Sequence, residues 1–223
     1  TLIIGGSKIS DKINMIKNLL PSLENLIIGG AMAFSFIKNI NNIDIGRTLY
    51  DESSKKYVEE IQNLITSYNN KPDTTINLIL PVDWVIAENI KSSEKDVYTT
   101  SNDIPKNYMG LDIGPESIYL FNKVINNLGN DSIIIWNGPM GVFEEKPFSY
   151  GTKCIVKTLI NKKDTKTVIG GGDSVSALNM FASKDEINNF IDNNNHISTG
   201  GGASLEFLEG KSLPGINVLN NIF

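Results

Sequence analysis

Four short apolar runs in this chain each end in a cluster of glycines and then turn into a helical pattern. They lie at residues 2–6, 26–30, 168–172 and 197–202. Glycine lets the backbone approach a ligand closely, and the helix that follows presents unpaired N–H groups and its positive dipole end at the same place. Ordinary tight turns also use glycine, but four such segments predict that several strand ends converge on one polyanion, with phosphate as the natural ligand.

Six short runs rich in β-branched residues alternate with helical patterns. The runs lie at residues 2–4, 26–28, 76–80, 133–136, 168–169 and 196–198, and the helical patterns at residues 13–20, 31–40, 53–68, 116–128, 150–160, 174–181 and 203–209. Such alternation implies right-handed crossovers between parallel strands. We therefore expect a doubly wound, Rossmann-like α/β domain, with a mainly parallel six-stranded sheet and helices on both faces.

Three local expectations accompany this fold. Ser10 is expected to cap the first helix, which Pro21 ends. Residues 84–109 have weaker periodicity and indicate a small antiparallel excursion beside the main sheet. Because ligands bind beyond the carboxyl ends of the strands in open parallel sheets, all four glycine clusters should lie on the ligand side.

Composition narrows the class of protein. With 223 residues the chain is long enough for one large domain with a buried core. Its net charge is −5 and Arg47 is its only arginine, so a broad basic face for nucleic acid is not expected. No apolar run reaches the ~18 residues that span a membrane. The single Cys154 excludes an internal disulfide framework and fits a reducing compartment, so we expect a cytoplasmic protein with a buried structural thiol. We also expect a monomer.

Two common phosphate-binding motifs fail when they are compared with the chain. The Gly-Lys-Ser sequence at residues 210–212 has Leu205 where a P-loop needs its first glycine. The two Gly-x-Gly sequences at residues 170–172 and 200–202 have Val175 and Leu205 in place of the third glycine of a dinucleotide fingerprint. The P-loop is therefore excluded, and classical dinucleotide binding is disfavoured.

Six longer strings remain, and together they are specific. They are GGSKISDK at residues 5–12, LPVD at 80–83, GLDIGP at 110–115, WNGPMGVFE at 136–144, GGGDS at 170–174 and STGGGAS at 198–204. The set resembles phosphoglycerate kinase, in order from Thr1 to Ile222, and it matches only the C-terminal half of that family. The resemblance implies that residues 1–223 form the nucleotide-binding domain of a two-domain kinase, whose N-terminal triose-binding domain is absent from this chain.

Two lysines follow the first glycine pair. Lys8 and Lys12 are spaced i and i+4, so on a starting helix both ammonium groups would face one side of the strand end, where they could clamp phosphates or simply be solvated. The resemblance implies that Lys8 stabilises the phosphoryl group in flight and that Lys12 contacts the nucleotide phosphates. It also places the transferring group beside Gly171 and Gly201.

An aspartate follows the third glycine cluster. Asp173 stands at an expected helix N-cap, where it could merely cap the helix, but a carboxylate beside phosphate is also what Mg²⁺ uses. The resemblance implies that Asp173 holds the metal. It further implies that the amides of Gly172, Asp173 and Ser174 contact phosphate, with a possible hydroxyl contact from Ser174.

The remaining expected site residues concern the nucleoside. Glu144 could accept hydrogen bonds from both ribose hydroxyls while a rigid turn packs against the sugar. The resemblance implies ribose or phosphate contacts from Asn137, Pro139 and Glu144, and an apolar slot for the base at Gly29, Gly30, Leu49 and Leu111. The chain departs from the family at Ala31, where a methyl group replaces a glycine beside the expected adenine.

The resemblance implies reversible phosphoryl transfer between 1,3-bisphosphoglycerate and ADP, giving 3-phosphoglycerate and ATP with Mg²⁺. We expect this chain alone to bind Mg-nucleotide and to be nearly inactive, because the triose-binding residues are missing. A nucleotide-binding module that does not catalyse is the alternative, and an NAD-dependent oxidoreductase is a third candidate. The lone His196 is assigned no role.

Overall fold

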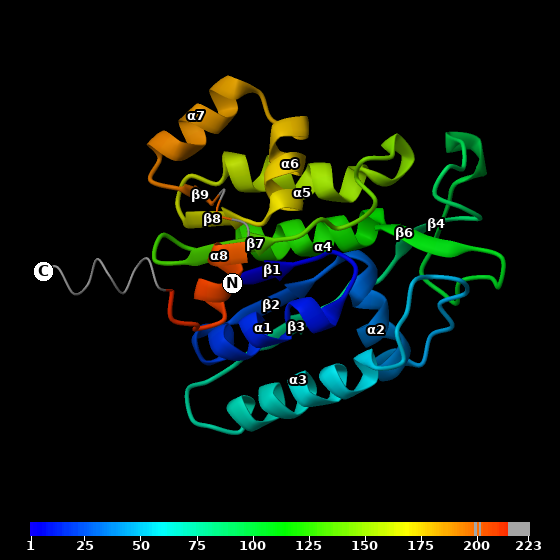
Figure 1. Ribbon diagram of the computed structural model, residues 1–223, viewed down its shortest axis with the longest axis horizontal. Helices are drawn as coiled ribbons and strands as arrows, with labels where there is room; N and C mark the ends of the chain where they lie inside the picture. Colours follow the sequence, from blue (N-terminus) through cyan, green and yellow to red (C-terminus); the bar gives the residue numbers. More distant parts are fainter. Residues whose placement is uncertain (199, 201, 214–223) are drawn as a thin grey trace, which may run out of the picture.

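The computed structural model describes residues 1–198, 200 and 202–213 and contains a six-stranded sheet in the order β3-β2-β1-β7-β8-β9 (Figure 1). Every neighbouring pair in this sheet is parallel. The strands are β1 (Leu2–Ile4), β2 (Asn25–Ile28), β3 (Asn77–Ile79), β7 (Ile133–Asn137), β8 (Lys166–Gly170) and β9 (His196–Ser198). The predicted parallel six-stranded sheet is confirmed.

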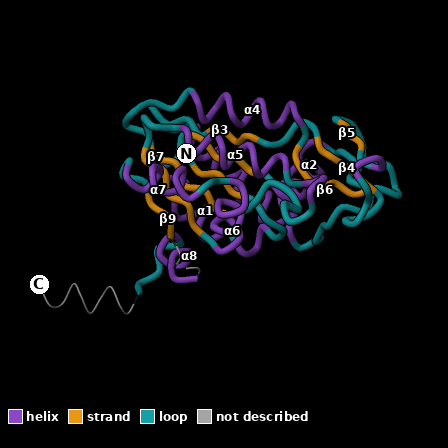
Figure 2. Tube along the Cα trace, turned by 90° about the horizontal axis from the view of Figure 1, so that it is seen from above, coloured by secondary structure: helices purple, strands orange, loops and turns teal. Residues whose placement is uncertain are grey.

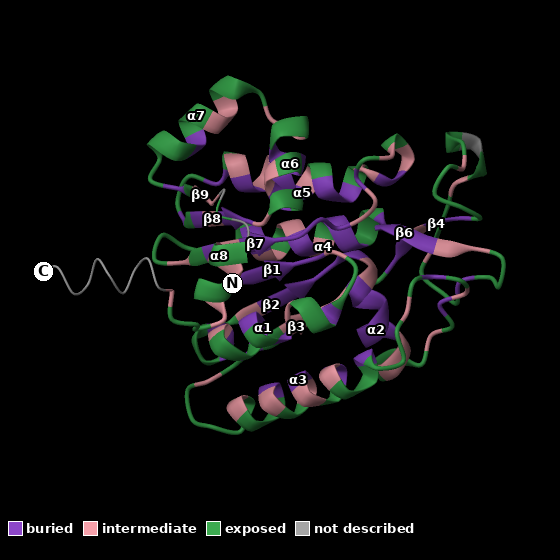
Figure 3. Ribbon diagram, in the orientation of Figure 1, coloured by how far each residue is buried: buried purple, intermediate pink, exposed green. Residues whose placement is uncertain are grey.

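Helices cover both faces of this sheet. Alternate residues of β1 point to opposite sides, because Leu2 and Ile4 belong to one hydrophobic cluster and Ile3 to another. The first cluster packs under α1 (Ile13–Leu19), α2 (Gly30–Asn41), α3 (Ser54–Asn69) and α8 (Gly202–Leu208), and the second under α4 (Pro115–Asn126), α5 (Tyr150–Asn161), α6 (Gly172–Phe181) and α7 (Lys184–Asp192). Figure 3 shows the buried strands between these helices. The doubly wound arrangement is therefore confirmed.

A second, smaller sheet lies between β3 and α4 in the chain. It contains β5 (Tyr98–Thr100), β4 (Trp84–Ala87) and β6 (Met109–Ile113) in that order, and both pairs are antiparallel. Figure 2 shows these strands together at one end of the molecule, apart from the main sheet. The predicted antiparallel excursion is confirmed, whereas β6 was not predicted as a strand.

The chain order of the strands places the glycine clusters together. They follow β1, β2, β8 and β9, and with β7 these are five consecutive strands of the sheet. The direction of winding reverses between β1 and β7, which is the point where open α/β sheets form a ligand crevice. The strand ends that the sequence predicted to converge therefore lie along one edge.

One local prediction is wrong, and one helix was not predicted. Ser10 does not cap α1, because the chain first forms a 3₁₀ turn at Ile9–Asp11 and α1 then starts with Lys12 as its N-cap, without a side-chain cap. The Ser10 hydroxyl instead donates to Asp11 Oδ1 at 3.0 Å. The helix α7 was missed, although Ser183 and Glu186 form a capping box that is readable in the sequence as Ser-x-x-Glu.

Among the described residues, no helix has both the length and the apolar composition that crossing a bilayer requires.

Replacing a core residue of α4 should test how far the sheet depends on this helix. Phe121 is fully buried in the second cluster, whereas Tyr119 on the same helix is 67% exposed. We expect Phe121→Ala to lower the free energy of unfolding by about 3–5 kcal/mol through lost burial and a cavity. Tyr119→Ala, the matched control, should change it by less than about 0.5 kcal/mol. Urea unfolding followed by circular dichroism measures both, and equal effects would contradict the packing described.

Candidate functional site

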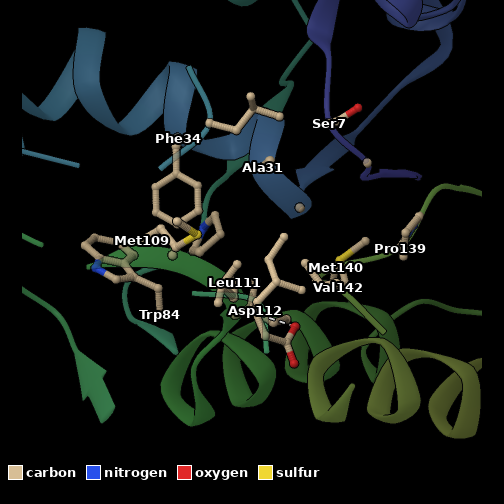
Figure 4. Close-up of a pocket in the computed structure, with 18 of the residues that line it drawn as sticks. Ser7, Ala31, Phe34, Trp84, Met109, Leu111, Asp112, Pro139, Met140 and Val142 are labelled. Carbon is tan, nitrogen blue, oxygen red and sulfur yellow. Dashed lines mark hydrogen bonds between the residues drawn. The ribbon is translucent and has the colours of Figure 1, made fainter. Parts of the chain in front are cut away.

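A cavity of about 290 Å³, which we call the main cavity, lies where the ends of the parallel strands meet the smaller sheet. Figure 4 shows Phe34, Trp84 and Met109 on one side of it and Ser7 and Pro139 on the other. We call these two sides the apolar end and the glycine end. The cavity thus joins segments of the chain that are far apart in the sequence.

The apolar end is built from three elements. Phe34 of α2 packs edge-on against Trp84 of β4, with ring centroids 5.8 Å apart. Gly110 of β6 leaves room for the Phe34 ring, because a Cβ at that position would overlap the ring. Leu49 and Ile90 also line the cavity and are 59% and 43% exposed. A flat apolar ligand in the cavity would bury these side chains, and a nucleobase has that shape.

The glycine end depends on the β7–α5 loop, which we define as residues 138–149. The carbonyl of Pro139 accepts from the Gly6 amide at 2.9 Å, and the carbonyl of Met140 accepts from the Gly30 amide at 3.0 Å. Gly30 has a φ of +65°, and a Cβ there would lie 2.5 Å from the Gly6 nitrogen. Two strand ends and the loop therefore approach one another through their backbones. The approach of backbone to a ligand, which the glycine pattern indicates, stays a prediction.

Asn137, the last residue of β7, lies at the centre of the strand ends. Its Oδ1 accepts a hydrogen bond from Lys12 Nζ, while its buried Nδ2 has no partner among the described residues. Burial lowers the pKa of Lys12, and the nearby carboxylates of Asp173 and Asp11 oppose this shift. An unpaired buried donor costs free energy, so an anionic acceptor beside Asn137 would be stabilising. The structure thus brings three predicted site residues together.

The start of α6 differs from the prediction in one respect. Gly171 is the N-cap and Gly172 the first helical residue, so the expectation that Asp173 caps the helix is wrong. Asp173 lies in the first turn, is exposed and lines the main cavity. Gly171 has a φ of +92°, and a Cβ there would lie 3.0 Å from Asn137 Nδ2. The carboxylate of Asp173 is therefore available to a ligand.

The hydroxyl of Ser174 has a structural partner. Its oxygen accepts from the Gly138 amide at 2.7 Å, and the side chain is fully buried. This bond joins α6 to the β7–α5 loop.

Lys8 lies apart from Lys12. It is exposed and lines a second cavity of about 50 Å³, where it lowers the pKa of Asp51 after the larger effect of two hydrogen bonds from Ser53. Because Lys8 precedes the 3₁₀ turn in extended conformation, the expected helical i, i+4 relation to Lys12 does not form. Ser7 and Leu49 line both cavities, which places the two cavities side by side.

The other predicted residues have mixed positions. The main cavity is lined by Leu49, Leu111, Pro139, Glu144 and Gly30. It is also lined by Ala31, the residue at which the chain departs from the family pattern. Gly29 packs against Met140, and Gly201 lies outside the described residues. Cys154 is half-buried rather than buried, and burial raises the pKa of its thiol, which disfavours a nucleophilic role. Within the described part of the chain, no group of three or more metal-binding side chains is present.

Sequence reasoning missed several residues of the cavity, among them Phe34, Trp84, Met109, Val142 and Asp112. Asp112 is buried beside Leu111, and burial raises its pKa to about 8 against two backbone hydrogen bonds that lower it. The string GLDIGP contained this residue, but nothing in the string shows that its carboxyl is buried. Burial of a carboxyl without a cationic partner depends on tertiary packing.

The family model described as phosphoglycerate kinase matches residues 1–211. The chain belongs to the phosphoglycerate kinase family. The phosphoglycerate kinase of Clostridium botulinum (strain 657 / Type Ba4) is 43% identical over 219 residues, which are 98% of this chain and 50% of that relative. That of Penicillium citrinum is 42% identical over 222 residues, 98% of this chain and 49% of that relative.

Solved phosphoglycerate kinases have the same fold. The structure from Coxiella burnetii has a TM-score of 0.80 and 33% identity, covering 98% of this chain and 52% of that chain. The structure from Pyrococcus horikoshii OT3 has a TM-score of 0.73 and 26% identity, covering 98% and 51%. The chain therefore spans about half the length of the phosphoglycerate kinases it matches.

A methyl group at Gly171 should disturb the start of α6. We expect Gly171→Ala to lower the free energy of unfolding by about 1–3 kcal/mol, because φ is positive and the Cβ would press on Asn137. Gly129→Ala is the matched control, because a Cβ there meets nothing within 4 Å. Urea unfolding compares the two variants. A Gly171→Ala variant as stable as the control would contradict the described backbone.

Proposed function

We propose that this chain binds a magnesium complex of ADP or ATP in the main cavity. One observation carries the proposal: a single cavity is lined both by the apolar end and by Asp173 at the start of α6. A nucleotide needs both surfaces, because the flat faces of its base pack against apolar side chains and its phosphates are anionic. The base would contact Leu111 and Val142, and Glu144 would accept from the ribose hydroxyls.

A cation and several hydrogen-bond donors are available where the phosphates would lie. Lys12 supplies a cation and Asn137 supplies an unpaired donor. The first amides of α6 point their N–H groups out of the helix end, where the dipole favours negative charge. The net charge of −5 does not oppose this arrangement, since exposed charges act only within about 8 Å at physiological salt.

The donor set fits Mg²⁺. This ion uses one or two carboxylates and otherwise phosphate oxygens and water, so Asp173 alone suffices on the protein side. When bound, the ion would neutralise charge on the transferring phosphoryl group. The protein's own part would be to orient the phosphates through Lys12 and the amides of Gly172, Asp173 and Ser174, and to exclude water from the base through the apolar end.

The proposed activity of the full protein is phosphoryl transfer between 1,3-bisphosphoglycerate and ADP, giving 3-phosphoglycerate and ATP. Residues 1–223 would be the nucleotide-binding domain, with Lys8 and Gly201 facing the transferring group. Because the chain spans about half the length of its relatives, we propose that it binds nucleotide alone but turns over little. We also propose that the protein is a cytoplasmic monomer without nucleic-acid or membrane partners.

One observation favours the alternative of a binding module that does not catalyse. Lys8, the residue proposed to act on the phosphoryl group, lines the second cavity beside Asp51 rather than the main cavity. A catalytic role would require its side chain to turn toward the phosphates. Binding could rely on Lys12 and the amides alone.

Titration calorimetry separates these functions. We expect heat of binding with Mg-ADP and Mg-ATP and none with NAD. A coupled kinase assay of the same chain should show little turnover. Robust turnover would refute the proposal that the chain alone is nearly inactive. Binding of NAD instead of ADP would overturn the nucleotide assignment.

The metal role of Asp173 predicts a magnesium-dependent effect. Asp173→Ala should raise the Kd for Mg-ATP far more than the Kd for ATP in excess EDTA, because only the metal complex uses the carboxylate. Asp185→Ala is the matched control, since Asp185 holds the same position in the first turn of α7 and is exposed. Equal losses with and without magnesium would show that Asp173 acts only through its charge on the helix.

A further inference from the structure

Asp112 is a buried carboxyl that the proposed chemistry does not use. It lies in β6 directly after Leu111, is 3% exposed and lines the main cavity. No cation contributes to its environment in the described part of the chain. Its charged form is favoured only by backbone hydrogen bonds from Gly151 and Ile113. Burying such a carboxyl costs free energy, so its burial in the fold needs a physical explanation.

The carboxyl lies between β6 and the first turn of α5. Its Oδ2 accepts from the Gly151 amide at 2.7 Å, and its Oδ1 accepts from the Ile113 amide at 2.9 Å. A Cβ at either Gly141 or Gly151 would overlap the carboxyl. Both neighbouring segments therefore approach Asp112 closely enough to exclude any side chain, and Figure 4 shows the carboxyl directed away from the cavity toward the helices below it.

The first turn of α5 in turn carries the β7–α5 loop. Thr152, the residue after Gly151, is fully buried and accepts from the Met140 amide at 3.0 Å through its hydroxyl. On the other side, the Val142 amide donates to the carbonyl of Leu111 at 2.9 Å. Leu111, Met140 and Val142 all line the main cavity. The spacing between β6 and α5 thus sets the spacing between Leu111 and the loop.

We propose that Asp112 is a positioning residue for the nucleotide, which acts by holding the first turn of α5 against β6 and so fixes the walls of the base slot. The inference rests on the proposed function. Asp112 touches no reacting atom. It acts through Gly151 and Gly141.

The carboxyl should also couple nucleotide binding to pH. Burial raises its pKa to about 8. A bound nucleotide brings negative charge and covers the cavity, and both effects favour the neutral carboxyl. Binding should therefore take up protons near pH 8, and affinity should fall as the pH rises through this value.

Other titratable groups near Asp112 are few. β4 has none, and Lys38 of α2 is paired with Glu52. The remaining groups on α5 and the loop are Tyr150, Lys153, Cys154, Lys157, Glu144, Glu145 and Lys146, and the last of these is paired with Glu94. Of these, Cys154 interacts electrostatically with Asp112, and Lys157 and Glu145 are paired with Glu186 and Lys91. Lys12 could also weaken binding at high pH, so the test compares variants at each pH.

The chain offers a matched control. Asp83 is also 3% exposed and also holds the start of a helix, since its carboxylate accepts from the amides of Glu116 and Ser117 in α4. Asp83 is not one of the residues that line the main cavity. Asp83→Ala therefore removes a buried carboxylate that holds a helix start, but it does not remove a residue proposed to position the walls of the base slot.

The experiment measures the Kd for Mg-ATP by calorimetry at pH 7 and pH 9, in buffers of different ionisation enthalpy. We expect Asp112→Ala to raise the Kd about tenfold at pH 7, and Asp83→Ala to raise it less than about threefold, although both lower the melting temperature. Asp112→Asn keeps an acceptor for Gly151, so its affinity at pH 7 should stay within about threefold of the wild type. It should lose the proton uptake and part of the pH dependence.

Each outcome decides something. Absence of ATP binding by the wild-type chain would refute the proposed function itself. Wild-type binding with equal losses in the two alanine variants would show that Asp112 is only structural. A pH profile and proton uptake unchanged in Asp112→Asn would refute the coupling. If Asp112→Ala does not fold, the Asn variant and the wild-type proton uptake still decide the question.

Discussion

The backbone of the β7–α5 loop holds the cavity together. Its carbonyls at Pro139 and Met140 accept from the glycine amides that end β1 and begin α2, and its amide at Val142 donates to β6. These bonds require main chain to approach main chain, which explains why glycines lie on both sides of the crevice. The strands, the smaller sheet and the helices α2, α5 and α6 all take their relative positions at the cavity from this loop.

Much of the architecture follows from local pattern. Alternating apolar runs and helical patterns predicted the doubly wound sheet, because parallel strands need crossover helices and right-handed crossovers leave few topologies. The glycine clusters predicted where the strand ends meet, since all carboxyl ends of a parallel sheet share one edge. The pairing of β1 with β7 could not be predicted from the sequence, because 128 residues lie between Ile4 and Ile133 in the chain and only tertiary packing brings the strands together.

The errors have physical causes. The spacing of Lys8 and Lys12 predicted a shared helical face, but a 3₁₀ turn intervenes and directs Lys8 toward Asp51. The helix at the triple glycine starts at Gly172, because Gly171 can adopt a positive φ and act as the cap, which leaves Asp173 free. Asp112 was overlooked because its carboxyl is distinguished by burial rather than by sequence. Membership of the phosphoglycerate kinase family is shown by comparison, whereas the roles of single residues remain proposals.

The central claim is that one cavity receives both ends of a nucleotide. A crystal structure of the chain with Mg²⁺ and a non-hydrolysable ATP analogue tests it most directly. We predict the base between Leu111 and Val142, the metal at Asp173, and a phosphate oxygen within hydrogen-bond distance of Asn137 Nδ2. A nucleotide bound elsewhere, or one in the cavity that leaves Asn137 Nδ2 unpaired and Asp173 without metal, would contradict the claim.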